Sequence, residues 1–234
     1  MNATLAYINI AKVKRSSISN IRKYELYRPL LNIASMCTDT DRISGRVKFA
    51  GVLYVLGKTN EAINTLYSIQ PKPMFVRRKC HYRNIIRNDH YAEKTSSDYM
   101  QTVIKGFGRE YFVRKCTSID VRYVMDEIDI VPNDFKYELF HVPKTNLSRV
   151  GAFVDPDFLM YYLLYKCHTE LGNKAGAKAA FISLNKITKQ KSFDPYVEYR
   201  EVAFNVLGLC YMERENYLKA YHCFCRAMSL RPYL

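Results

Sequence analysis

Apolar residues recur three or four positions apart in two consecutive stretches of residues 201–234. This spacing places them on one face of an α-helix, so each stretch predicts a helix with one apolar face. Pro232 ends the second helix, because its ring blocks the preceding turn. The residues expected to pack between the two helices are Phe204, Leu207, Gly208 and Tyr211 from the first and Ala220, Phe224 and Ala227 from the second.

Two earlier stretches, residues 43–76 and 158–191, carry the same pattern less completely. In the first, Gly57 breaks the helix and Ala62 lies on the returning helix. In the second, Gly172 makes the turn, and Ala177 and Phe181 lie on the returning helix. Small residues let two helices approach closely, and large ones fill the gap beside them. We therefore predict three antiparallel helix hairpins.

The last hairpin has the spacing aromatic-x2-Leu-Gly-x2-Tyr, then Ala-x3-Phe, Ala and Pro. This spacing resembles the tetratricopeptide repeat, whose period is about 34 residues. The resemblance implies an all-α fold in which hairpins stack as an irregular array, with a concave surface that holds a peptide or a partner domain. We also expect the outer face of the last helix to be apolar, and either exposed or covered by a partner.

The hairpins are expected to form one helical domain over residues 18–234, with an irregular helical insert at residues 77–157 that interrupts their stacking. Extended structure is expected at most as a short segment within residues 115–132, where β-branched residues gather. The carboxylates of Asp126, Glu127 and Asp129 in this insert are expected to be solvated.

The start of the chain is basic. Residues 1–17 are expected to be a basic lead to the domain, with disorder or an organelle transit peptide as alternatives. Helical spacing then continues from Ile18 to Cys37, with a kink or a break expected at Pro29. Further along, Asp155 followed by Pro156 predicts the start of a helix, with the aspartate as its cap.

Positive charge is concentrated in the first half of the chain. Residues 1–115 hold 21 Lys and Arg against 8 Asp and Glu, whereas residues 116–234 hold 15 against 14. Basic surface favours polyanionic partners such as nucleic acid. The candidate polyanion-binding residues are Arg77, Arg78, Lys79, Arg83 and Arg87.

The 7 cysteines are an odd number and are spread widely, and no secretory signal precedes them. This pattern favours free, mostly buried thiols in a reducing compartment. We expect a cytoplasmic protein, with the nucleus as the alternative. No apolar run approaches the roughly 20 residues that span a bilayer, so no membrane span is expected.

Residues of the types used in catalysis are present without the spacing that catalysis requires. Cys80 and His81 are adjacent, and neither forms a paired zinc motif with His90 or Cys116. Gly106-Phe107-Gly108 lacks the strand and the Lys-Ser/Thr of a phosphate loop. His168 takes a packing position. We therefore expect no enzyme, no cofactor and no metal.

A broader resemblance follows the order IDIVPNDFKYELF, VDPDFLMYYLLYKCHTELGNKAGA and AFNVLGLCYMERENYLKAYHCFCRAMSLRP. It is similar to the helical carboxy-terminal region of invertebrate proteins related to cyclic GMP-AMP synthase and the male-abnormal nucleotidyltransferases. In that family an upstream domain carries a Gly-Ser loop and acidic metal ligands, which nothing here matches. The resemblance implies a non-catalytic appendage, or a fragment of a larger innate-immune protein of this type.

Together these patterns predict a protein–protein interaction or scaffold module of tetratricopeptide type. A protein or peptide is the expected partner. The alternative function is binding of nucleic acid or another polyanion through the basic first half.

Overall fold

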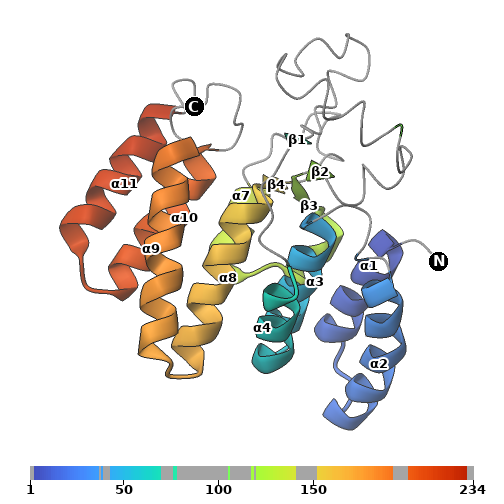
Figure 1. The fold of residues 1–234 in the computed structure, drawn as a ribbon. Helices are drawn as coiled ribbons and strands as arrows, with labels where there is room; N and C mark the ends of the chain where they lie inside the picture. The colour runs from blue at the N-terminus through green and yellow to red at the C-terminus, as the bar shows by residue number, and fades with distance from the viewer. Residues whose placement is uncertain are drawn as a thin grey trace.

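The computed structural model describes residues 3–36, 38, 43–69, 76–77, 105, 117–118, 120–140, 152–191 and 200–230. The helices in these residues are α1 (Ala3–Arg15), α2 (Asn20–Met36), α3 (Ser44–Val55), α4 (Thr59–Tyr67), the 3-10 helix η2 (Met125–Ile130), α7 (Asn133–Phe140), α8 (Pro156–Glu170), α9 (Lys174–Lys191), α10 (Arg200–Glu213) and α11 (Tyr217–Leu230). The predicted all-α fold is confirmed. Figure 1 shows the helices side by side in a curved row from α1 and α2 to α11.

The row consists of consecutive hairpins, α1/α2, α3/α4, α8/α9 and α10/α11, and each pairs helices that are neighbours in the chain. Helix α8 packs on both α3 and α4, and α10 packs on α9. The hairpins therefore stack directly on one another. The expectation that residues 77–157 interrupt the stacking is wrong, because α8 returns to the surface of the hairpin before the insert.

Three of the hairpins turn in the same way. Gly57 and Gly172 have positive φ angles of 74° and 69°, and Glu215 stands at the matching place with a φ of 57°. In each turn the next residue donates its N–H to a carbonyl five residues back, as Asn173 does to His168 at 2.9 Å. This is the Schellman motif at the C-terminus of a helix. Glycine is favoured at the position with positive φ because a residue with a Cβ atom is strained there.

The small residues lie where the helices cross. A Cβ atom built on Gly208 would lie 2.6 Å from the Phe224 ring, so this glycine admits the ring of the facing helix. The other described residues that were expected to pack between the helices are also buried, and Phe204 is the most exposed of them. They are Phe204, Leu207, Tyr211, Ala220, Ala227, Ala177, Phe181 and Ala62. Pro232 lies outside the described residues.

Most of the stretch expected as a basic lead is helical, so the alternative of disorder is wrong for residues 3–15. Residues 3–15 form α1, and one side of this helix is buried through Ala6, Tyr7, Ile10 and Ala11. Lysine and arginine occupy its solvent side and its last turn, where positive charge stabilises a helix end. Helix α2 then runs through Pro29 without being divided.

Four short strands pair in two places. β3 (Val121–Tyr123) is antiparallel to β4 (Ala152–Val154), and β1 (Val76–Arg77) is parallel to β2 (Thr117–Ser118). The expected limit of residues 115–132 for extended structure is too narrow, because β1 and β4 lie outside it. A strand needs a partner for its backbone groups, so extended residues in one segment require extended residues elsewhere.

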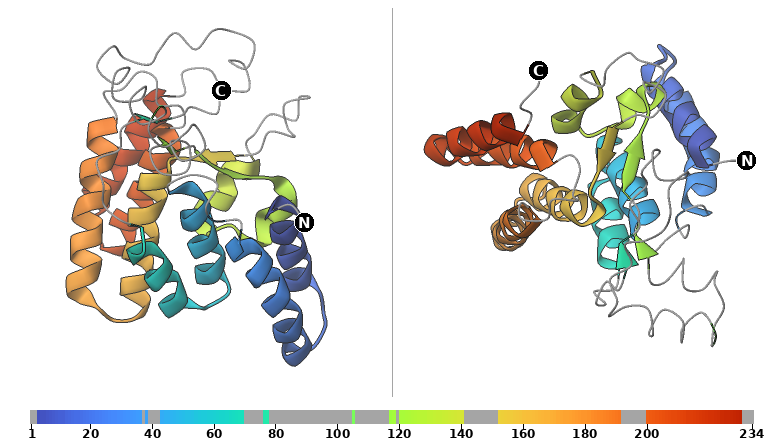
Figure 2. Two further views of the ribbon diagram at one scale, coloured as in Figure 1. Left: turned by 45° about the vertical axis from the view of Figure 1, so that its right-hand side comes forward. Right: turned by 90° about the horizontal axis from the view of Figure 1, so that it is seen from above.

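Residues 120–140, which we call the crossing segment, contain β3, η2 and α7. Contacts join η2 to α1 and α3, β3 to α3, and α7 to α10, so the segment crosses the row (Figure 2). Phe135 packs edge-on against Tyr162 of α8, with ring centroids 5.0 Å apart. The crossing segment therefore covers the side of α8 that carries Tyr162.

A buried ion pair ties this segment to the row. Glu127 is fully buried, and both of its carboxylate oxygens lie 2.9 Å from the Lys48 amine on α3. The same amine donates to the Arg122 carbonyl at 2.7 Å and lies 4.7 Å from the centre of the Tyr7 ring. The expectation that Glu127 is solvated is wrong, because its counter-charge comes from a helix 79 positions away in the chain.

Gly208→Ala should destabilise the protein by about 1–3 kcal/mol, because the new methyl group meets the Phe224 ring in a packed crossing. Without that contact, the change would stabilise a helix by about 0.5–1 kcal/mol. Urea unfolding followed by circular dichroism measures the sign. In the Phe224→Leu background the penalty should shrink, and an unchanged penalty there would contradict the contact.

Glu127→Gln should lower the free energy of unfolding by about 3 kcal/mol, because it leaves the Lys48 amine buried without a counter-charge. The same exchange at Glu61 is the matched control, because that side chain is 58% exposed in its pair with Lys58. Glu61→Gln should lower the free energy of unfolding by less than about 1 kcal/mol. Equal decreases in the free energy of unfolding for the two variants, measured with urea, would contradict a stabilising role for the buried pair.

Candidate functional site: the outer face of the last helix

Large apolar side chains line the outside of α11. Leu218, Tyr221 and Met228 are 69%, 64% and 67% exposed, and Cys225 lies partly exposed between the last two. Their spacing of three, four and three positions places them on one stripe of the helix. We call these four residues the end face, because α11 is the last helix of the row (Figure 1). The described chain has nothing packed over them.

The end face has positive charge beside it. Helix α11 carries Lys219 and Arg226, both exposed, and has no Asp or Glu anywhere in its sequence YLKAYHCFCRAMSL. The nearest carboxylates in the chain are those of Glu213 and Glu215, before the turn that leads into α11. Lys219 and Arg226 are seven positions apart, so both positive charges lie on the same side of the apolar stripe.

The opposite side of α11 fixes the end face in position. Ala220, Cys223 and Ala227 are buried against α10, and Phe224 lies over Gly208. At the start of α11, the side chain of Asn216 accepts the N–H of Lys219 at 3.3 Å and caps the helix. The stripe is therefore held on a rigid hairpin.

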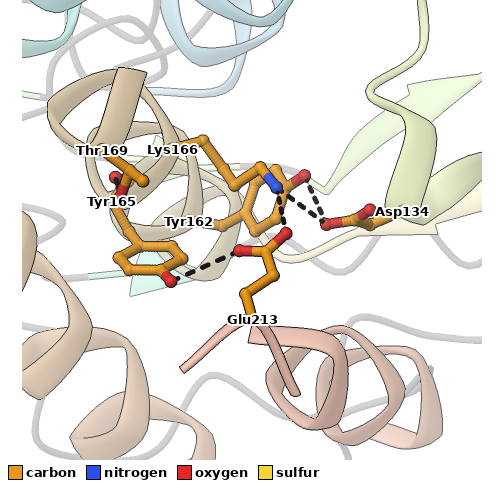
Figure 3. Close-up of polar contacts among 6 residues, drawn as sticks. All are labelled: Asp134, Tyr162, Tyr165, Lys166, Thr169 and Glu213. Carbon is orange, nitrogen blue, oxygen red and sulfur yellow. Dashed lines mark hydrogen bonds and ion pairs between the residues drawn. The ribbon is translucent and has the colours of Figure 1, made fainter. Parts of the chain in front are cut away.

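A cluster of polar side chains holds that hairpin to the rest of the row (Figure 3). The Tyr162 hydroxyl donates to Asp134 of α7 at 2.9 Å, and the Tyr165 hydroxyl donates to Glu213 of α10 at 3.3 Å. The Lys166 amine binds Glu213 and lies 3.7 Å from Asp134. Three helices thus meet through one lysine and two carboxylates.

The protonation states of this cluster suit a structural role. Burial lowers the pKa of Lys166, but its hydrogen bond to Glu213 and the charge of Asp134 outweigh burial, so the net pKa is raised and the amine stays charged. Burial is the main reason that the pKa of Tyr165 is raised to about 12. Burial also raises the pKa of Tyr162. Both phenols remain neutral donors at neutral pH, and every named group in the cluster has a partner.

The buried thiols are likewise unreactive. Burial raises the pKa of Cys167 to about 12 and raises those of Cys210 and Cys223. A thiol must lose its proton to act as a nucleophile or a metal ligand, so these three side chains behave as packing groups. No group of three or more metal-ligating side chains occurs within the part of the chain that the structure describes.

His168 is buried on α8 and lies against Gly176 of α9, where a Cβ atom would come within 2.7 Å of its ring. Its Nε2 atom lies 2.8 Å from the Tyr67 hydroxyl of α4, so the side chain joins two neighbouring hairpins. It thus lies among packing residues, in the place where the last hairpin has Tyr211.

Of the basic residues singled out in the sequence, the structure describes the backbone of Arg77 alone, so the predicted polyanion-binding patch stays a prediction. Arg77 belongs to β1, and Arg78, Lys79, Arg83 and Arg87 lie outside the described residues. The same holds for Cys80, His81, His90 and Cys116, and for Gly106-Phe107-Gly108. Among the described helices, none has the length and apolar character needed to cross a membrane.

The apolar outer face predicted for the last helix is present, but the repeat pattern does not single out its residues. The signal was present, because Leu218, Tyr221 and Met228 follow helical spacing of their own beside the buried set. They were passed over because the repeat pattern draws attention to the inward residues alone.

Comparisons of the chain with profiles of known protein families, with curated proteins and with solved structures found no match.

Among the described cysteines, Cys225 should react first with iodoacetamide at neutral pH, because Cys167, Cys210 and Cys223 are buried with raised pKa values. Peptide mapping by tandem mass spectrometry over a time course measures this and separates Cys223 from Cys225. In denaturant the four thiols should react at similar rates. Faster modification of Cys210 than of Cys225 in the folded protein would contradict this packing of α11.

Proposed function

We propose that the protein is a non-catalytic interaction module that binds a partner protein on the end face. The observation that carries this proposal is the stripe of Leu218, Tyr221 and Met228, three large apolar side chains that are each about two-thirds exposed on one rigid helix. A continuous apolar stripe with a polar rim is typical of a protein interface, since isolated exposed apolar residues rarely align in this way.

The concave side of the row is a weaker candidate than the resemblance to tetratricopeptide repeats suggests. Phe135 packs on Tyr162 and Phe158 of α8, and Asp134 accepts the Tyr162 hydroxyl there. The crossing segment thus covers the side of α8 that carries Phe158 and Tyr162, so this side is not open to a peptide. A partner that binds the end face displaces none of the elements that the structure describes.

The chemistry of the end face favours a partner that presents an acidic amphipathic helix. Leu218, Tyr221 and Met228 match the spacing by which a helix buries an apolar stripe against another helix. Lys219 and Arg226 beside the stripe attract carboxylates at the rim of such a partner. The α11 helix of a second copy has no Asp or Glu to meet these charges, so an acidic partner fits the surface better.

The resemblance to the helical region of cyclic GMP-AMP synthase-like and male-abnormal-type proteins supports the same proposal. In that family the region is an appendage to a catalytic domain. A module of this kind acts by holding another domain or protein in place, which requires a rigid surface and no assembled catalytic site.

A photo-reactive amino acid introduced at Tyr221 tests the proposal in cells that express the whole chain. It should cross-link one protein selectively, and mass spectrometry identifies that protein. The matched control is the same replacement at Ile182 on α9, which is also exposed, at 56%, but lies outside the end face. Equal cross-linking from both positions would contradict a specific surface.

Affinity for the purified, identified protein then provides the quantitative test. Leu218→Glu should weaken binding by tenfold or more, because a buried interface contact of roughly 2 kcal/mol is replaced by a desolvated charge. Ile182→Glu should leave the affinity unchanged. Light scattering must show a monomer in the absence of partner, since a stable dimer broken by Leu218→Glu would assign the end face to a second copy.

A further inference from the structure

A hollow of about 420 Å³ lies between the first two hairpins, where the end of α1 and the start of α2 meet the turn between α3 and α4. Its polar lining comes from Lys14, Asn20, Lys23, Tyr24, Tyr27 and Lys58. Three of these side chains are cationic and none is acidic. The volume falls within the range of about 300–1,000 Å³ that small-molecule sites occupy.

Two of the three amines have no carboxylate partner among the described residues. The Lys14 amine donates to the Val55 carbonyl at 3.0 Å, and the Lys23 amine donates to the Lys14 carbonyl at 3.3 Å. Within the described residues, neither amine lies at ion-pair distance from a carboxylate, whereas Lys58 pairs with Glu61 at 2.6 Å. An ammonium group has three hydrogens to donate, so Lys14 and Lys23 retain donors for a ligand.

The surroundings of Lys14 disfavour its positive charge, so an anion next to the amine would be stabilising. Burial lowers the pKa of this amine, and the charge of Lys136 lowers it further. The charge of Asp129 raises the pKa, but its effect is smaller. A partly buried cation of this kind is stabilised by any phosphate that enters the hollow.

Aromatic rings stand beside the amines. Tyr24 is 65% exposed, and the Lys58 amine lies 5.6 Å from the centre of its ring. Tyr27 is half-buried on the next turn of α2. Cations next to an exposed ring are the combination that proteins use for phosphates and stacked bases.

We propose that this hollow binds a nucleotide, with its phosphates on Lys14, Lys23 and Lys58 and its base against Tyr24. The nucleotide is either free or one unit of a single strand, because both present the same phosphate and base to the hollow. The site is independent of the end face and lies in the first two hairpins of the row.

Titration of the full chain with a fluorescent ATP analogue, and separately with a short labelled single-stranded RNA, tests the proposal by fluorescence polarisation. Binding of the free nucleotide identifies one source, and binding of the RNA alone identifies the other. Lys23→Glu should weaken the binding about tenfold or more, since a charge-assisted hydrogen bond contributes about 1.5–3 kcal/mol. Tyr24→Leu should weaken it several-fold.

The matched control is Lys178→Glu, which makes the same charge change at an exposed position on α9. It should leave the affinity unchanged, and circular dichroism should show that all variants are folded. Binding of neither ligand at millimolar concentration would overturn the proposal. So would an affinity that Lys23→Glu and Lys178→Glu reduce equally, or inorganic triphosphate binding as tightly as ATP with no effect of Tyr24→Leu.

Discussion

The amine of Lys48 is the point on which the arrangement of the fold depends. Its three hydrogens are directed to the two carboxylate oxygens of Glu127 and to the Arg122 carbonyl, and the rings of Tyr7 and Tyr123 flank it. The residues come from α1, α3, β3 and η2. Removing one member leaves a buried charge uncompensated, so these elements hold together or separate together. Through this lysine the crossing segment becomes part of the helical row.

The attachment of the crossing segment to α1 and α3 also determines which surfaces of the row are open to a partner. With η2 fixed against α1 and α3, α7 reaches α8 and α10, and Phe135 fills the space beside Tyr162. The side of α8 that carries Tyr162 is then core. The hairpins remain helix pairs of the usual kind, but the surface proposed for a partner lies at the end of the row, where α10 is the helix packed against α11 among the described elements.

The sequence predicted the hairpins well because their signals are local. Small and large residues at the crossing, with Gly57 and Gly172 at two of the turns, define each predicted hairpin within about 34 residues. The position of Glu127 could not be predicted, because it depends on a lysine 79 residues away. Helix α1 was missed for a different reason: Ala6, Tyr7, Ile10 and Ala11 have helical spacing, but the basic composition around them was given more weight. The hollow was missed with it, since Lys14 belongs to that helix.

The two proposed sites lie at opposite ends of the row, with the hollow between the first two hairpins and the end face on the last (Figure 1). This separation follows the charge of the chain, because the first half carries most of the net +14 and the second half is nearly neutral. The lining of the hollow comes from α1, α2 and the turn after α3, whereas the end face belongs to α11. The two sites share no residue, so an anion in the hollow and a partner on the end face do not compete for the same atoms.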